Sequence, residues 1–148
     1  MVCMPIEKLK LHQRFSVWPL HITIAAWFDI SNFELPNFLD ILDRISQRTK
    51  SITVIGGEVN YYGRKKNIKV REIKPNKDLV LIRDQIMQAI ENAKAKTISR
   101  NNVFKPHVTF NSEGKSLNKN QLVNIKELIL VSKIAPSEKQ AVEILRLK

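Results

Sequence analysis

The sequence is short of several features that would mark other classes of protein. It has a single cysteine, Cys3, so no internal disulfide can form, and this fits a reducing compartment. No stretch approaches the roughly eighteen consecutive apolar residues of a membrane-spanning helix, and the first ten residues lack the apolar core of a signal peptide. With 148 residues and an apolar fraction of 43%, the chain can bury one core. We therefore expect a soluble cytoplasmic protein with one domain, residues 1–148.

Acidic residues are also scarce. The chain has 14 Asp and Glu against 25 Lys and Arg, a formal net charge of +11. A basic chain favours polyanionic partners, with nucleic acid as the first candidate. The lysines are scattered along the chain, however, as they are on many ordinary solvated surfaces. The charge therefore becomes an argument about function only if a phosphate site is found elsewhere.

Hydrophobic periodicity predicts an α+β fold. Helices are expected over 37–50 and 76–96, where apolar residues recur at helical spacing. The stretch 97–106 is expected to be a loop and 116–125 a turn or short helix. Strands are expected over 2–6, 20–28, 51–63, 64–73, 107–111, 125–134 and 141–148. Each half of the sequence would then hold a helix and several strands, a weak internal duplication.

One pattern, Pro-(x)-His-apolar-Thr-apolar, occurs twice, in "WPLHITI" and in "KPHVTF". In a strand, residues i and i+2 point to the same face, so His21 projects with Thr23, and His107 with Thr109. The apolar residues between them project the other way and are expected to bury against helices. If a pseudo-twofold axis relates the two halves, the two polar pairs meet across one groove.

Two imidazoles and two hydroxyls around one point suit displacement at phosphorus. Histidine titrates near neutral pH, so one imidazole can act as general base and the other as general acid. Threonine hydroxyls can hold the non-bridging phosphate oxygens. A lone His-x-Thr strand is ordinarily only a strand, but here two of the 3 histidines carry the pattern, and His12 is left as a surface residue. The sequence shows no metal-ligand pattern, and no metal or other cofactor is expected.

With "WPLHITI", "FKPHVTF" and the closing "LILVSKIAPSEKQAVEILRL" in this order, nearly the whole chain resembles the 2H phosphoesterase superfamily. This group contains the 2'-5' RNA ligase-like proteins and cyclic phosphodiesterases. The resemblance implies a bilobal fold, with two pseudo-symmetric lobes of antiparallel sheet around a central cleft and helices on the outside. It implies that His21 and His107 are the catalytic pair and that Thr23 and Thr109 bind phosphate. It also implies metal-free action on 2',3'-cyclic phosphates, 2'-5' linkages or signalling nucleotides.

Five further residues are candidate substrate contacts. Lys69 and Arg71 lie on the polar face of the strand expected over 64–73, where a phosphate-binding groove would use them. Arg100 and Lys105 flank the second motif. Trp27 shares the alternation of His21 and Thr23, so it either stacks on a base or completes the core.

The sequence leaves the roles of several other positions open. The basic run 64–66 forms either a substrate contact or a solvated hairpin tip, and Ser132 has either a structural or a ligand-binding role. Tyr61 and Tyr62 cannot both face the groove, and Phe110, on the opposite side from His107, is assigned to packing.

These observations predict a metal-independent phosphoesterase for RNA ends or small nucleotides, first of all a 2',3'-cyclic phosphodiesterase with two-histidine acid–base catalysis. The alternative within the enzymes is a 2'-5' phosphodiesterase or RNA ligase, including one that degrades a signalling oligonucleotide. The alternative from another class is a non-catalytic RNA-binding module. The expected partners are RNA with a 2',3'-cyclic phosphate or 2'-5' linkage, or small nucleotides. No membrane partner is expected, and the chain is expected to be a monomer.

Overall fold

A computed structural model describes residues 1–98 and 103–148 of the chain. Within these residues the helices are α1 (Leu35–Arg48) and α2 (Lys77–Asn92). The strands are β1 (Val2–Pro5), β2 (Arg14–Phe15), β3 (His21–Ala25), β4 (Phe28–Asp29), β5 (Ile52–Tyr62), β6 (Ile68–Ile73), β7 (Lys96–Thr97), β8 (His107–Thr109), β9 (Leu122–Ile125), β10 (Glu127–Ala135) and β11 (Glu138–Arg146). Neither described helix is long and apolar enough to cross a membrane.

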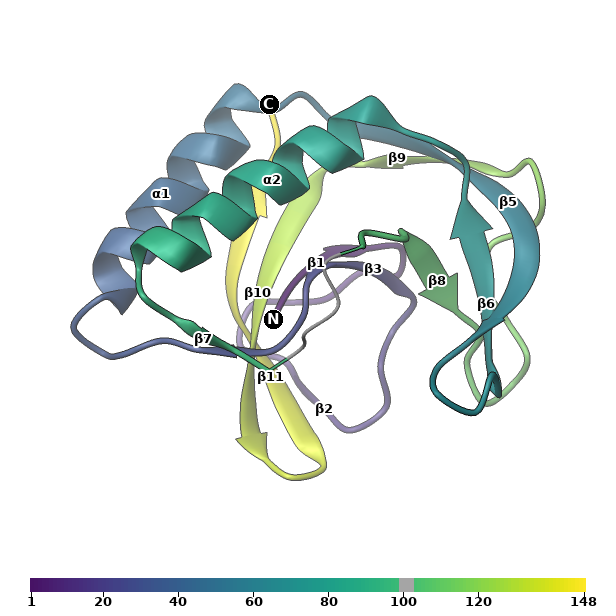
Figure 1. Ribbon diagram of the computed structural model, residues 1–148, viewed down its shortest axis with the longest axis horizontal. Coiled ribbons are helices and arrows are strands. Elements are labelled where there is room, and N and C mark those ends of the chain that lie inside the picture. Colours follow the sequence, from purple (N-terminus) through teal and green to yellow (C-terminus); the bar gives the residue numbers. More distant parts are fainter. Residues whose placement is uncertain (99–102) are drawn as a thin grey trace.

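A single antiparallel sheet organises the molecule (Figure 1). Its 9 strands follow the order β2-β11-β10-β1-β3-β8-β6-β5-β9, while β4 and β7 form a separate two-stranded sheet. Strands β3 and β8, which carry the two His-x-Thr motifs, are neighbours inside the large sheet, with Ile22 opposite Val108. One group of strands, β2, β11, β10 and β1, lies on the β3 side of this pair. The other group, β6, β5 and β9, lies on the β8 side, so the two groups meet at the motifs.

The two groups of strands are not the two halves of the sequence. The C-terminal hairpin β10–β11 joins the N-terminal strands through β1, with Cys3 opposite Ile129, whereas β6 from the first half of the chain pairs with β8. The predicted duplication in element order is present, with one helix and several strands in each half, but the strand pairing exchanges strands between the halves. Strand pairing depends on matching register and apolar pattern between distant segments, and neither can be read from element order.

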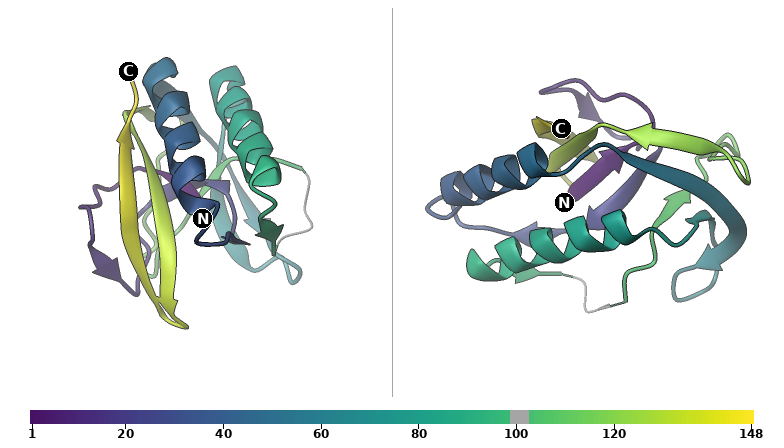
Figure 2. Two further views of the ribbon diagram at one scale, coloured as in Figure 1. Left: turned by 90° about the vertical axis from the view of Figure 1, so that its left-hand side faces the viewer. Right: turned by 90° about the horizontal axis from the view of Figure 1, so that it is seen from above.

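Both helices cover the same face of the sheet and lie side by side (Figure 2). Helix α1 begins with Pro36 in its first turn, a position that tolerates the missing N–H. The Asn76 side chain caps α2 by accepting a hydrogen bond from the Leu79 N–H. Helix α2 ends four residues before the predicted boundary because Lys94 adopts a φ of 52°, in the left-handed region.

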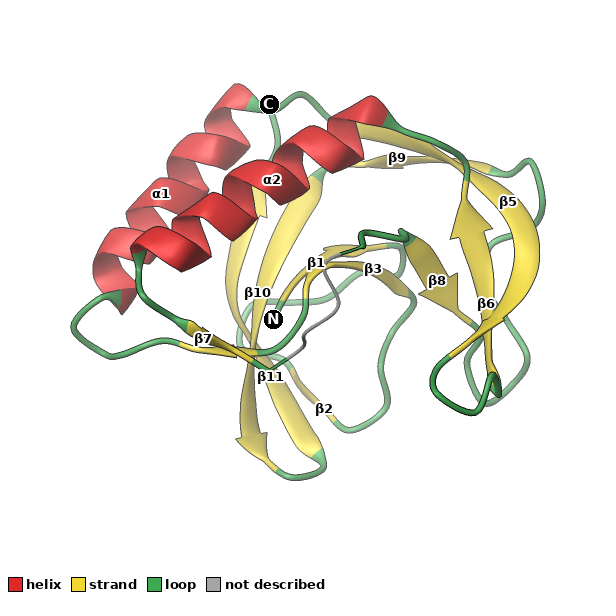
Figure 3. Cartoon of the chain, viewed as in Figure 1, coloured by secondary structure: helices red, strands yellow, loops and turns green. Residues whose placement is uncertain are grey.

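Several strands also differ from the sequence prediction (Figure 3). The stretch predicted as a turn or short helix contains β9, whose four residues pair with β5, so that Ile125 lies opposite Ile52. This strand is too short to show a period of its own. The predicted Gly-Gly irregularity is confirmed, because the β5–β6 register shifts between Gly56 and Val59. A Cβ on Gly56 would stand 2.1 Å from the Asn118 carbonyl oxygen, so this close approach needs glycine.

Apolar side chains form two buried clusters, one on each face of the sheet. The larger lies between the sheet and the helices, where Phe38 and Leu42 of α1 and Ile82 and Ile86 of α2 are fully or almost fully buried. The smaller cluster lies on the opposite face. Its buried members are Cys3, Leu9, Ile129, Val131 and Ala141. Burial of an apolar side chain contributes roughly 1.5–3 kcal/mol, so the larger cluster holds the helices on the sheet.

Candidate active site

The strand pair β3–β8 brings the two His-x-Thr motifs together on one face of the sheet. The strands are antiparallel with Ile22 opposite Val108, so His21 lies across from Thr109, and Thr23 across from His107. Ile22 and Val108 project the other way and are both 0% exposed, which confirms their predicted burial against the helices. The four polar side chains share the other face, which we call the histidine face.

Both imidazoles are oriented by the same local contact. The His21 Nδ1–H donates to the Pro19 carbonyl oxygen at 2.8 Å, and the His107 Nδ1–H donates to the Lys105 carbonyl oxygen at 2.7 Å. A carbonyl oxygen can only accept, so the proton of each neutral ring lies on Nδ1. A proline with a fixed φ sits in each segment, Pro19 or Pro106, and restricts the backbone that makes this turn. Within residues 1–98 and 103–148, neither Nε2 makes a hydrogen bond, so each can exchange a proton with a bound reactant.

The surroundings of His21 are aromatic and apolar. Its ring lies 4.3 Å from the Trp18 ring, centroid to centroid, with 30° between the planes, and Trp18 in turn meets the edge of Phe15 at 4.9 Å. Burial lowers the pKa of His21, as does the nearby charge of His107, although the hydrogen bond to Pro19 acts in the opposite direction. His21 is therefore neutral at neutral pH, with a lone pair on Nε2.

The surroundings of His107 are polar and acidic. Glu72 of β6 lies directly across from it, and the edge of the Tyr62 ring stands 4.9 Å from the imidazole, centroid to centroid. Glu72 Oε1 accepts hydrogen bonds from Asn60 Nδ2 and from the Tyr62 hydroxyl, each at 2.8 Å. These two bonds hold the pKa of the Glu72 carboxyl below its usual range. An ionised carboxylate therefore lies beside His107.

The tyrosine in this group stays protonated. Burial, and then its hydrogen bond to Glu72, raises the pKa of Tyr62 to about 12. The pseudo-symmetric motifs therefore sit in different electrostatic surroundings, apolar at His21 and anionic at His107. This asymmetry suits different roles for the two histidines, with His21 as a neutral base.

Among the five candidate substrate contacts, the structure brings Lys105 to the histidine face. The side chain is exposed, and its Nζ stands 5.8 Å from the centre of the Tyr62 ring. Arg100 lies outside the described residues. The open choice between the tyrosines is also resolved, because Tyr62 faces His107 whereas Tyr61, one residue away, points to the other side and is 51% exposed.

Lys69 and Arg71 lie on the opposite face of the sheet from the histidines. Arg71 is paired with Val108, while buried Val70 is paired with Thr109. The Arg71 guanidinium donates to the carbonyl oxygens of Leu117 at 2.8 Å and Gly57 at 3.1 Å. Alternation separates the polar residues of a strand from the apolar ones, but it does not reveal which set faces a distant strand. The expectation that these two cations line the histidine face is therefore corrected.

Lys69 and Phe110 make a second contact on that opposite face. The Lys69 ammonium stands 4.6 Å from the centre of the Phe110 ring, and the Phe110 N–H donates to the Lys69 carbonyl oxygen at 3.0 Å. The assignment of Phe110 to packing, on the side away from His107, is confirmed.

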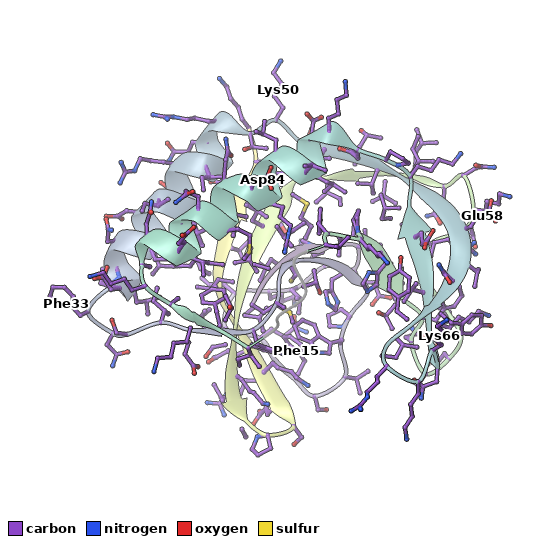
Figure 4. All side chains as sticks on the ribbon, in the orientation of Figure 1. Phe15, Phe33, Lys50, Glu58, Lys66 and Asp84 are labelled. Atoms are coloured by element: carbon purple, nitrogen blue, oxygen red, sulfur yellow. The ribbon has the colours of Figure 1, made fainter. Side chains whose placement is uncertain are left out.

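Trp27 lies beside Trp18, and a role in stacking on a base stays a prediction. It packs half-buried against the smaller apolar cluster, with its ring centre 6.2 Å from that of Trp18. Together with Ser132 it lines a cavity of about 630 Å³ that the two histidines do not border. The basic run 64–66 is exposed in the turn between β5 and β6, where Figure 4 shows Lys66 pointing outward.

Sequence reasoning missed four side chains around the motifs. They are Trp18, Asn60, Glu72 and Lys139. Trp18 could have been found from its place inside the first motif, and Glu72 from its alternation with Val70. Asn60 and Lys139 reach the site only through strand pairing, which the sequence does not display.

The family model described as the 2'-5' RNA ligase superfamily matches residues 1–124. A search of curated proteins gives no match. Among the residues that the structure describes, no three His, Cys, Asp or Glu side chains gather as they would around a metal ion.

Solved structures with a similar fold include TT0787 of Thermus thermophilus, with a TM-score of 0.67 and 16% identity over 88% of this chain and 81% of that one. LigT of E. coli, complexed with 3'-AMP, has a TM-score of 0.62 and 17% identity over 86% of this chain and 76% of its own. A protein described as a phosphoesterase has a TM-score of 0.61 and 16% identity, over 86% of this chain and 77% of its own. At these identities the likeness shows the fold, a mostly antiparallel sheet with two helices.

Proposed function

The chain belongs to the 2'-5' RNA ligase superfamily, and from this premise we propose that it is a metal-independent phosphoesterase acting on RNA ends or small nucleotides. The observation that carries the proposal is the pair of imidazoles on one sheet face, each with Nδ1 tied to a carbonyl and Nε2 free. The proposed site consists of His21, His107, Thr23 and Thr109, with Lys105 at its edge. It omits Lys69 and Arg71.

The first reaction we propose is hydrolysis of a 2',3'-cyclic phosphate. His21 Nε2 removes a proton from water as the water oxygen bonds to phosphorus, and the bond from phosphorus to O3' breaks. His107 gives its Nε2 proton to the leaving O3', so that a 2'-phosphate is formed. Thr23 and Thr109 donate hydrogen bonds to the phosphoryl oxygens, where negative charge increases in the transition state.

The two histidine roles follow from their surroundings. A base must be neutral before it acts, and burial against Trp18 keeps His21 neutral. The acid must give a proton to the leaving oxygen, and His107, whose Nδ1–H is held by the Lys105 carbonyl oxygen, presents its Nε2 for that transfer. In the reverse direction the roles exchange, because the same proton transfers run backwards.

A second candidate reaction uses the same groups on a 2'-5' phosphodiester. A ribose hydroxyl then takes the place of water as the attacking or leaving group, which allows cleavage, ligation or removal of a signalling oligonucleotide. The observation that favours this candidate is the superfamily itself, which is named for 2'-5' RNA ligase. The non-enzymatic alternative remains an RNA-binding module that keeps the charge and turns nothing over.

The test is turnover of 2',3'-cyclic AMP, and of a short RNA with a 2',3'-cyclic phosphate end, in the presence of EDTA. His21→Ala and His107→Ala are each expected to lose about two to four orders of magnitude in rate. His12→Asn is the matched control, because His12 is exposed and its φ of 61° suits asparagine. Undiminished turnover in either alanine variant would contradict the mechanism, and tight, salt-dependent RNA binding without turnover would favour the binding module.

A further inference from the structure

One guanidinium on α2 contacts both the strand of the first motif and the segment that leads into the second. Arg83 Nη1 donates a hydrogen bond to the Ile24 carbonyl oxygen of β3. The Arg83 Cζ also stands 4.8 Å from the centre of the Phe104 ring. Phe104 directly precedes Lys105, whose carbonyl oxygen accepts the His107 Nδ1–H at 2.7 Å. A single side chain therefore joins two segments that are about eighty residues apart in the sequence.

The Ile24 carbonyl lies at an irregularity in β3. In the pairing of this strand with β1, Thr23 lies opposite Cys3. Ala25 lies opposite the neighbouring Val2, which leaves Ile24 as one residue in excess. An extra residue of this kind is a β-bulge, which bends the strand and changes the direction of the side chains beside it. Because Thr23 comes just before the bulge, a partner for the Ile24 carbonyl also influences the direction of the Thr23 hydroxyl.

The segment before β8 is held at its two ends by different partners. At its start, Phe104 packs against the larger apolar cluster and against the Arg83 guanidinium. At its end, the Ile73 N–H of β6 donates at 3.0 Å to the carbonyl oxygen of the proline just before β8. The Lys105 carbonyl that orients His107 lies between these two points. A shift of Phe104 therefore changes the position of the oxygen that holds the imidazole.

Stability alone does not require a guanidinium at this position. Arg83 is half-buried, and burial lowers the pKa of its guanidinium, although the charge of Asp84 acts in the opposite direction. Among residues 1–98 and 103–148, neither of the ion pairs involves Arg83. An apolar side chain of similar length, such as methionine, would fill the space without the cost of desolvating a charge. Unlike methionine, a planar guanidinium can donate to a carbonyl oxygen and lie on an aromatic ring at the same time.

Arg83 acts from the helix side of the sheet, because it lies on α2, which packs on β3 from that side. A phosphate on the histidine face is therefore out of its reach, and Arg83 is not a catalytic residue. The site residues nearest to its two contacts are Thr23 and His107, which lie across from each other on β3 and β8.

We propose that Arg83 is a positioning residue, which ties β3 to the segment before β8 and so holds Thr23 and His107 in a fixed arrangement on the histidine face. This inference rests on the proposed function and deepens it, because it names what keeps one half of the two-histidine site aligned.

The orientation of His107 can be measured without turnover. Long-range ¹H–¹⁵N NMR distinguishes an imidazole that carries its proton on Nδ1 from one that carries it on Nε2. At about pH 8.5, where an ordinary imidazole is neutral, both motif histidines of the wild type are expected in the Nδ1–H form. In Arg83→Met, His107 is expected to become a mixture of the two forms. His21 should keep its form, because the Pro19 carbonyl that holds it lies before the other end of β3.

Hydrolysis of 2',3'-cyclic AMP gives the second measurement. Arg83→Met is expected to lower kcat by about ten- to a hundredfold, because a displacement of about 1 Å in a reacting group has an effect of this size. KM is expected to change by less than about threefold, since Arg83 does not contact the substrate. Arg83→Lys keeps the charge and a donor but loses the planar fork, so both readouts should lie between those of the wild type and Arg83→Met.

Arg71→Met is the matched control for a half-buried arginine. Arg71 also donates to two backbone carbonyl oxygens, those of Leu117 and Gly57, which lie outside both motifs. Urea unfolding is expected to show a loss of stability in this variant. The form of the His107 imidazole and kcat are expected to stay as they are in the wild type.

An unchanged His107 imidazole in Arg83→Met would overturn the proposal. The same change of form in Arg71→Met would also overturn it, because the change would then follow from lost stability alone. A rise in KM with kcat unchanged would do so as well, since it would indicate a contact between Arg83 and the substrate. Failure of the proposed function is seen separately, as absence of turnover by the wild type, and the NMR comparison then still decides whether Arg83 holds the imidazole.

Discussion

Removal of the Tyr62 hydroxyl tests how the structure holds a carboxylate beside His107. Tyr62→Phe keeps the ring whose edge contacts the imidazole and deletes the O–H that donates to Glu72 Oε1 at 2.8 Å. The second bond to the same oxygen, from Asn60 Nδ2, remains. The change is therefore confined to one charge-assisted hydrogen bond.

The expected change in the free energy of unfolding follows from the type of hydrogen bond that is deleted and from its exposure to water. A hydrogen bond to an ionised group contributes about 1.5–3 kcal/mol when buried, but Glu72 is only half-buried and water competes for its oxygens. We therefore expect the free energy of unfolding to fall by about 1 kcal/mol at pH 7. A double-mutant cycle with Glu72→Gln should give a coupling energy of the same size.

The loss of unfolding free energy in Tyr62→Phe should also depend on pH. The two hydrogen bonds hold the pKa of Glu72 below its usual value of 4.5 in the folded protein, so its stabilising effect is present above that value. It disappears as the pH falls through the folded pKa, because the carboxyl is then protonated in both states. Urea unfolding followed by tryptophan fluorescence, at pH 7 and at successive steps below 4.5, should show the two proteins converge. If the difference in unfolding free energy between the wild type and Tyr62→Phe stays constant over this pH range, the reasoning is refuted. A coupling energy near zero at pH 7 would refute it as well.

The remaining predictions concern the other histidine and the backbone of β5. Because burial lowers the pKa of His21, and a base acts in its neutral form, the acidic limb of kcat/KM against pH should lie below 6.5; a limb above 6.5 in a pH–rate profile would contradict the role of His21 as a buried base. Gly56→Ala should lower the free energy of unfolding by about 1–3 kcal/mol, because the new Cβ meets a backbone carbonyl at 2.1 Å, while Gly114→Ala, with open space around it and a φ of 72°, should cost only about 1 kcal/mol. Thermal unfolding of the two variants side by side measures these changes in stability. Equal losses of stability would show that the backbone shifts to relieve the contact between the new Cβ and the Asn118 carbonyl oxygen.

The sequence was most informative where the pattern is local. Both helices were predicted because their apolar residues recur with helical period over long stretches, and the face of β3 and β8 followed from simple alternation about Ile22 and Val108. The doubled motif indicated the pair of histidines because each motif is a short continuous segment. The two segments pair as β3 and β8.

Features that depend on strand pairing could not be predicted. The assignment of Lys69 and Arg71 to the histidine face failed because a strand has two faces, and only its pairing with β8 determines that Val70 and Glu72 point toward the histidines. The contact between Lys139 and Trp18 joins the last strand to a loop near the N-terminus, a separation that no local pattern spans. The different surroundings of the two histidines likewise arise from the partner strands and not from the motifs.

The central claim is that His21 and His107 together break a phosphate ester without a metal, and ³¹P NMR of the reaction tests it most directly. With EDTA present, the wild type is expected to replace the resonance of a 2',3'-cyclic phosphate, or of an internal 2'-5' diester, by that of its hydrolysis product. His107→Ala is expected to leave the spectrum unchanged over the same time, and His12→Asn to behave as the wild type does. Conversion of substrate by His107→Ala at the wild-type rate, or no conversion of either substrate by the wild type, would contradict the account.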